Sequence, residues 1–103
     1  MTDTRVKMLM SYDVVPELQQ AYYEFVLGEL IPSAQTLGLV LSEAWHTAYG
    51  AYPIRLNGFV ARSKQDLDRI LATSDWQQLE EKLKRFVTGY QRKTVTYRDG
   101  FQF

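Results

Sequence analysis

Residues 5–14 read RVKMLMSYDV and residues 15–26 read VPELQQAYYEFV, and the hydrophobic period changes where the two segments join. The first segment alternates between two sets of side chains, which is the period of a half-buried strand. The second begins with Pro16 next to the junction, where a helix tolerates proline best, and carries apolar residues at helical spacing. The junction therefore predicts a strand that runs directly into a helix.

The same analysis extends to the middle of the chain. The helical stripe continues to Gly38, which suits a left-handed helix end, and Pro32 predicts a kink because its ring clashes with the carbonyl of Gly28. Residues 39–49 and 54–62 alternate as two strands joined by a turn that contains glycine and proline. Neither set of side chains in residues 39–49 is cleanly apolar, so the buried face of that strand is left open.

The last third of the chain predicts two short helices and a strand. Ser63 and Ser74 each precede a polar residue at capping-box spacing, which places a helix start at both. The second helix carries an amphipathic stripe of Trp76, Leu79, Leu83 and Phe86. Its charged residues, Glu80 among them, are predicted on the water side, and residues 90–98 alternate as a polar, edge-like strand.

Composition limits the class of protein. The 103 residues suit a single domain over 1–103, and 12 basic residues balance 12 acidic ones, which disfavours binding to nucleic acid or to an anionic membrane. The absence of cysteine excludes disulfides and thiolate chemistry. No secretory signal opens the sequence, and the apolar runs are shorter than the roughly 20 residues of a membrane span, so we expect a cytoplasmic protein.

The order strand, helix, strand, strand, helix, strand predicts an α+β fold of the ferredoxin-like βαββαβ type. Its four-stranded antiparallel sheet has the order 4-1-3-2, with both helical units on one face. The alternation predicts a mixed set on the other face: Leu9, Ser11, Asp13, Arg55, Asn57 and Phe59. The opposite set of residues 54–62 is then predicted to face the helices: Ile54, Leu56, Gly58 and Val60. A partly polar, partly apolar face suits one that is covered, and a second copy of the sheet is the simplest cover.

Three features resemble a known superfamily over nearly the full length. They are the kinked first helix carrying Pro32, the strand Ala44-Trp45-His46, and the segment at residues 74–79, SDWQQL. With the order of the elements, they make the chain similar to the dimeric α+β barrels, and within them to NIPSNAP and antibiotic-biosynthesis-monooxygenase-type domains. The resemblance implies two subunits packed sheet to sheet, with a cavity in each. Such families share topology while they differ in activity, so it implies no reaction.

His46 is the first candidate for acid or base catalysis, because it alone among the side chains has an unperturbed pKa near neutrality. Its small neighbours Ala44 and Ala48 leave room either for a ligand or for close packing, so a structural role is the alternative. Some monooxygenase-type relatives degrade haem with an Asn, Trp and His set, but their histidine lies on a helix and His46 lies in a strand pattern. That activity is not carried over. No second histidine or cysteine exists to complete a transition-metal site, and we expect neither a metal nor a cofactor.

Polar residues on the mixed face are candidates for ligand binding. Arg55, Asn57 and Asp13 are placed to orient a ligand, since an arginine on a covered face needs an acceptor. The alternative is an Asp13–Arg55 contact across neighbouring strands or across a dimer seam. Aromatic candidates that could line a pocket are Tyr12, Tyr22, Tyr23, Tyr49 and Tyr52, and the alternative for them is the core or the subunit interface. Trp45 is a further candidate for ligand binding, and in an assembly module it would belong to the interface.

These patterns leave two functions open. The first is a homodimeric α+β barrel that binds a small, mostly apolar organic molecule, either simply as a binder or as a cofactor-free monooxygenase-like or isomerase-like enzyme with His46 as acid or base. The second is a non-catalytic binding or assembly module whose open face serves only dimerisation. No phosphate-binding glycine loop, nucleophile elbow or paired RNA-binding aromatics are present in the sequence.

Overall fold

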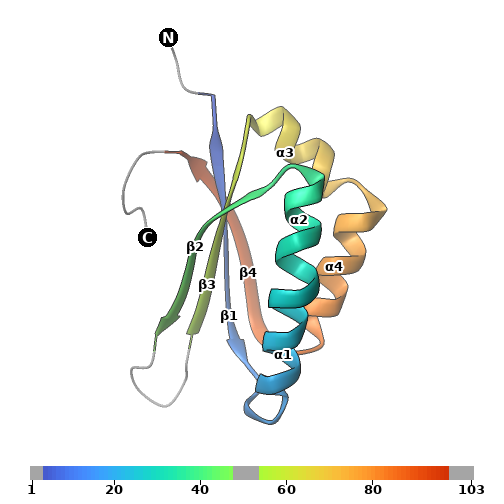
Figure 1. Cartoon of the computed structure of the whole chain (residues 1–103). Coiled ribbons are helices and arrows are strands. Elements are labelled where there is room, and N and C mark those ends of the chain that lie inside the picture. Colours follow the sequence, from blue (N-terminus) through green and yellow to red (C-terminus); the bar gives the residue numbers. More distant parts are fainter. Residues whose placement is uncertain (1–3, 48–53, 98–103) are drawn as a thin grey trace.

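The computed structural model describes residues 4–47 and 54–97 and contains one antiparallel sheet with helices on one side (Figure 1). The strands are β1 (Val6–Val14), β2 (Val40–Thr47), β3 (Ile54–Ala61) and β4 (Val87–Thr96). The helices are a 3-10 turn (Pro16–Leu18), α1 (Gln19–Phe25), a π-helical turn (Val26–Leu30), α2 (Ile31–Leu37), α3 (Lys64–Leu71) and α4 (Ser74–Lys84). The sheet order β2-β3-β1-β4 is the predicted order 4-1-3-2 read from the other edge.

The core lies between this sheet and the helices. From β1 it takes Met8, Met10, Tyr12 and Val14, which confirms the side of that strand predicted to be apolar. Helix α4 contributes Trp76, Leu79 and Leu83, as its stripe predicted, with Phe86 packed at the margin. None of the helices within residues 4–47 and 54–97 is both long enough and apolar enough to cross a membrane.

Strand β3 faces the other way from the prediction. Phe59 is fully buried in the helical core, whereas the sequence placed it on the open face. The cause is the register: Phe59 lies directly opposite Met8 and Ala61 opposite Val6, and directly opposed residues in antiparallel strands share a face. Val60, predicted to face the helices, is instead opposite Lys7 on the open side.

Two bulges shift the alternation of the outer strands. In β2 the register jumps between Leu41 and Glu43, and in β4 it jumps opposite the stretch between Ser11 and Asp13. Each extra residue exchanges the two faces of the strand beyond it. This explains why neither set of side chains in residues 39–49 was cleanly apolar.

The first helical unit bends through a π-helical turn. There the N–H of Ile31 donates to the carbonyl of Val26, five residues earlier. Pro32 has no N–H to offer the carbonyl four residues before it, and the wider turn absorbs that loss at the place where the kink was predicted. Gly38 ends α2 with φ of 108°, the left-handed conformation expected of it.

The predicted helix starts are right for α3 and wrong by one residue for α4. The hydroxyl of Ser63 accepts from the N–H of Asp66 at 3.1 Å, as the capping box required. In α4, however, Thr73 is the cap and accepts from the N–H of Trp76 at 3.2 Å, so Ser74 is already the first helical residue. Threonine and serine are both good caps, and sequence spacing alone does not choose between neighbours.

Candidate functional site

The strand register brings three of the predicted site residues into one row. His46 of β2 is opposite Arg55 of β3, and Arg55 is opposite Tyr12 of β1. The next row holds Asn57, which is opposite Ala44 on one side and Met10 on the other. These positions share the rows of Tyr12 and Met10 rather than those of Leu9, Ser11 and Asp13. The prediction that Arg55 and Asn57 join Asp13 on the open face is therefore wrong, for the same reason of register as Phe59.

Trp45 falls opposite Leu56. The side chains of residues 43–47 and 54–57 lie outside the described part of the structure, as do Ala48, Tyr49 and Tyr52 altogether. The roles assigned to His46, Arg55, Asn57 and Trp45 thus remain predictions that rest on strand position.

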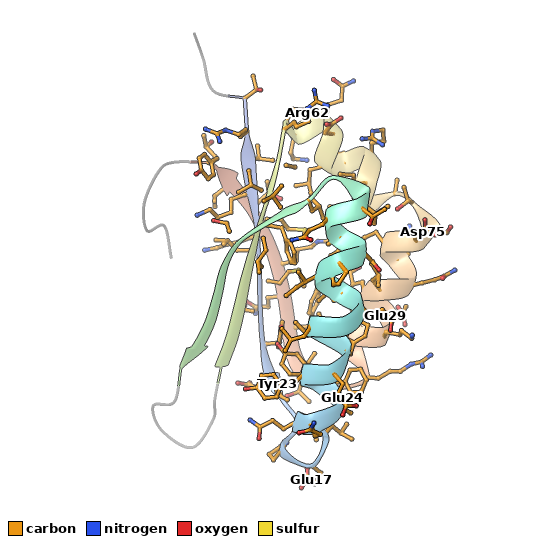
Figure 2. All side chains as sticks on the ribbon, viewed as in Figure 1. Glu17, Tyr23, Glu24, Glu29, Arg62 and Asp75 are labelled. Atoms are coloured by element: carbon orange, nitrogen blue, oxygen red, sulfur yellow. The ribbon has the colours of Figure 1, made fainter. Side chains whose placement is uncertain are left out.

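Tyr12, at the end of the row, forms a buried pair with Tyr22 of α1. Their hydroxyl oxygens are 2.5 Å apart and the rings meet edge to face with centroids 5.7 Å apart. The ring of Tyr23, which Figure 2 labels on α1, lies 5.5 Å from that of Tyr22 and is partly exposed. The rings of Tyr12, Tyr22 and Tyr23 therefore form a continuous series from the core beside the sheet to the surface of α1. The hydroxyls of Tyr12 and Tyr22 lie within the otherwise apolar core.

A second polar group, which the sequence did not reveal, lies on the other side of Tyr12. The ring of Tyr90 stacks on Tyr12 with centroids 6.4 Å apart. Its hydroxyl donates to Glu80 Oε2 at 2.6 Å, and Arg92 Nη1 donates to the same oxygen at 2.5 Å. Burial, followed by the neighbouring carboxylate of Glu80, raises the pKa of the Tyr90 phenol well above its ordinary value. Tyr90 is a neutral donor at physiological pH.

The Tyr90 group shows where sequence reasoning failed. Glu80 was expected on the water side of α4, but only 16% of its side chain is exposed. The bulge that contains Gly89, with φ of 64°, turns the following residues of β4 so that Tyr90 packs against the core. The glycine was the available signal, because a glycine beside a strand pattern often marks a bulge.

Asp13 stands apart from the row. It is opposite Ile54 and Thr88, and its Oδ1 is buried with no hydrogen-bond partner among the residues that the structure describes. The predicted contact between Asp13 and Arg55 involves different rows of the sheet. Within the described residues, no group of three or more His, Asp or Glu side chains could hold a metal ion.

Comparison with known proteins supports the fold. No family model matches the chain, and a search of curated proteins finds no significant match. Among solved structures, a NIPSNAP family protein from Agrobacterium tumefaciens superposes with a TM-score of 0.73 at 17% identity, covering 96% of this chain and 90% of that one. An uncharacterised NIPSNAP-like domain protein from Burkholderia xenovorans gives 0.70 at 18% identity, covering 98% and 91%.

The monooxygenase-type resemblance is also confirmed at the level of fold. A candidate antibiotic biosynthesis monooxygenase from Nitrosomonas europaea superposes with a TM-score of 0.67 at 12% identity, covering 94% of this chain and 91% of that one. At such identities a common fold says nothing of a common reaction. The chain is therefore a small α+β protein with the ferredoxin-like fold of these neighbours.

Proposed function

We propose that this protein is a homodimer that binds a small, mostly apolar organic molecule on the helical side of its sheet. The observation that carries the proposal is the row of His46, Arg55 and Tyr12, next to the buried hydroxyl pair of Tyr12 and Tyr22. Ligand sites are mostly apolar, with a few polar groups that fix orientation. The row supplies polar residues of that kind, and Met10 of the apolar core lies in the next row. In the proposed site Arg55 and Asn57 orient the ligand, with Trp45 beside them.

His46 is the proposed acid or base of a cofactor-free reaction of the monooxygenase or isomerase type. It stands two strands from Tyr12 in the same row, and its unperturbed pKa allows it to gain and lose a proton near neutral pH. The fold of the Nitrosomonas europaea neighbour supports this reaction class by analogy alone.

The second candidate is a non-catalytic assembly module, and the open face of the sheet favours it. Val40 is 61% exposed there and lies opposite the half-buried Val60. Apolar side chains on an uncovered face suit contact with a second copy. In this alternative the row of His46 carries no ligand.

Native mass spectrometry of the purified protein tests the proposal, because it reports subunit number and any retained small molecule together. We expect a dimer with added mass in the wild type, a dimer without it in Tyr22→Phe, and the added mass retained in Tyr97→Phe, which removes a hydroxyl away from the row. Once the added mass has identified the ligand, turnover of that ligand can be assayed. His46→Gln should then still bind the ligand but no longer turn it over. A monomer would contradict the dimer, and a dimer without added mass in all variants would favour the assembly module.

A further inference from the structure

Four tyrosine rings, here called the tyrosine series, follow one another through the protein. The centre of the Tyr22 ring lies 5.5 Å from that of Tyr23 and 5.7 Å from that of Tyr12. The centre of the Tyr12 ring lies 6.4 Å from that of Tyr90. Each step falls within the range of interacting aromatic pairs, about 4.5–7 Å. The tyrosine series thus joins α1, through β1, to the edge strand β4 (Figure 1).

One end of the tyrosine series is open to solution and its middle is not. Tyr23 is 40% exposed, and Figure 2 shows it on α1. Tyr22 and Tyr12 are buried in the core. Electrons pass readily between aromatic rings this close, so an oxidant that meets Tyr23 can draw an electron from the interior.

Tyr90, at the other end, has a proton acceptor in place. Its hydroxyl donates to Glu80 Oε2 at 2.6 Å, and Arg92 donates to the same oxygen and so fixes the carboxylate. Burial, followed by the Glu80 carboxylate, raises the pKa of the Tyr90 phenol, so Tyr90 keeps its proton as long as the ring is reduced. A phenol that has lost an electron is a strong acid. Its proton can then pass to Glu80 along the existing hydrogen bond.

Lys84 favours the loss of that proton. Its Nζ lies 5.5 Å from the centre of the Tyr90 ring. The ammonium group repels positive charge on an oxidised ring, whereas a neutral phenoxyl radical carries no net charge. An electron and a proton are therefore expected to leave Tyr90 together.

We propose that the tyrosine series transfers single electrons, and that Tyr90 is the residue left oxidised when a one-electron oxidant in solution reacts at Tyr23. The oxidant, a metal complex or an oxygen-centred radical, gains one electron and is reduced. The electron lost from Tyr23 is replaced ring by ring, so the net loss is one electron from Tyr90. The Tyr90 proton moves to Glu80 Oε2, which leaves a neutral phenoxyl radical beside a carboxylic acid. This activity needs no bound ligand, so it does not depend on the function proposed above.

Flash photolysis tests the proposal. Tris(bipyridine)ruthenium(II), excited in the presence of chloropentaamminecobalt(III) as electron acceptor, supplies ruthenium(III) as the one-electron oxidant. Phenoxyl absorption follows the radical in time, and electron paramagnetic resonance of frozen samples identifies it. We expect a long-lived phenoxyl radical in the wild type, because the Tyr90 ring is partly buried and shielded from other radicals. Its formation should be slower in D₂O, since a proton moves with the electron.

Variants locate the radical and its path. Tyr90→Phe should lose most of the long-lived signal, and Glu80→Gln, which removes the proton acceptor, should shorten its lifetime. Tyr22→Phe leaves Tyr90 and Glu80 in place but interrupts the tyrosine series, so it should slow formation of the radical. The matched control is Tyr97→Phe, which removes a hydroxyl outside the series and should change nothing. Circular dichroism verifies that each variant is folded; should Tyr90→Phe fail to fold, Glu80→Gln and the D₂O comparison test the same step.

Four results would overturn the proposal. The first is a wild type that forms no phenoxyl radical or forms a tryptophan radical in its place. The second is a long-lived signal that Tyr90→Phe leaves unchanged or that Tyr97→Phe removes equally. The third is an unchanged rate in Tyr22→Phe, which would mean that the oxidant reacts with Tyr90 directly. The fourth is the same rate in D₂O together with an unchanged lifetime in Glu80→Gln, which would exclude Glu80 as the proton acceptor.

Discussion

Removing the carboxylate of Glu80 should destabilise the fold more than removing any exposed charged group of α4. One oxygen of Glu80 accepts both from the Tyr90 hydroxyl at 2.6 Å and from Arg92 at 2.5 Å. Glu80→Ala leaves a part-buried phenol with no acceptor in that network and an arginine without its carboxylate. Both partners come from β4, so the contact also ties that edge strand to the helical layer.

The expected cost follows from the burial of each partner. A hydrogen bond to a charged group contributes about 1.5–3 kcal/mol. The ion pair to Arg92, whose side chain is 33% exposed, adds less than about 1 kcal/mol because water screens it. We therefore expect Glu80→Ala to lower the free energy of unfolding by about 1.5–4 kcal/mol.

Urea unfolding followed by tryptophan fluorescence measures this free energy. The matched control is Glu81→Ala, an exposed carboxylate one residue further along α4, which should change stability by less than about 0.5 kcal/mol. Combining Glu80→Ala with Tyr90→Phe should reveal a coupling of about 1 kcal/mol or more. A Glu80→Ala cost equal to that of the control, or no coupling to Tyr90, would refute the reasoning.

Three further outcomes are expected in the same unfolding assay. The folded state keeps the Tyr90 proton to a higher pH than the unfolded chain, so the stabilisation that the Tyr90 hydroxyl provides is complete below about pH 10 and falls above it. Above that pH the wild type should lose up to about 1.4 kcal/mol of unfolding free energy per pH unit relative to Tyr90→Phe. Parallel pH curves for the two proteins would contradict this expectation. Gly28→Ala should stabilise the protein by about 0.5–1 kcal/mol, since a Cβ there meets nothing within 4 Å. Gly89→Ala should instead cost about 1–2 kcal/mol, because the φ of Gly89 is 64°. A Gly89→Ala variant of unchanged stability would contradict the left-handed backbone of the bulge. Thr73→Ala should cost about 1 kcal/mol and Ser74→Ala less than about 0.5, and the reverse order would restore Ser74 as the cap of α4.

The elements that could be predicted are those whose signals are local. The alternation in β1 and the stripe of α4 each face a single core, so their periods are clean and the buried sides were right. The Ser63 cap joins two residues that are only three positions apart, and it too was right. Similarly, the order of the elements and the rule for their connections were enough to predict the sheet order.

The candidate site was predicted only in part. Tyr12, Arg55 and His46 were each singled out, but the row that unites them depends on how β1, β2 and β3 are aligned. Tyr90 and Glu80, ten residues apart, meet because α4 packs on the sheet beside β4. No periodicity in either segment records that contact.

By itself, the sequence determined the set and order of the elements and the buried sides of β1 and α4, because local spacing decides both. The tertiary structure decided which side of β3 is buried. Both sides of β3 carry apolar residues, so only its register against β1, with Phe59 opposite Met8, could choose between them. The bulges in β2 and β4 were decided in the same way, because one inserted residue exchanges the faces of a strand without changing the residues that compose it.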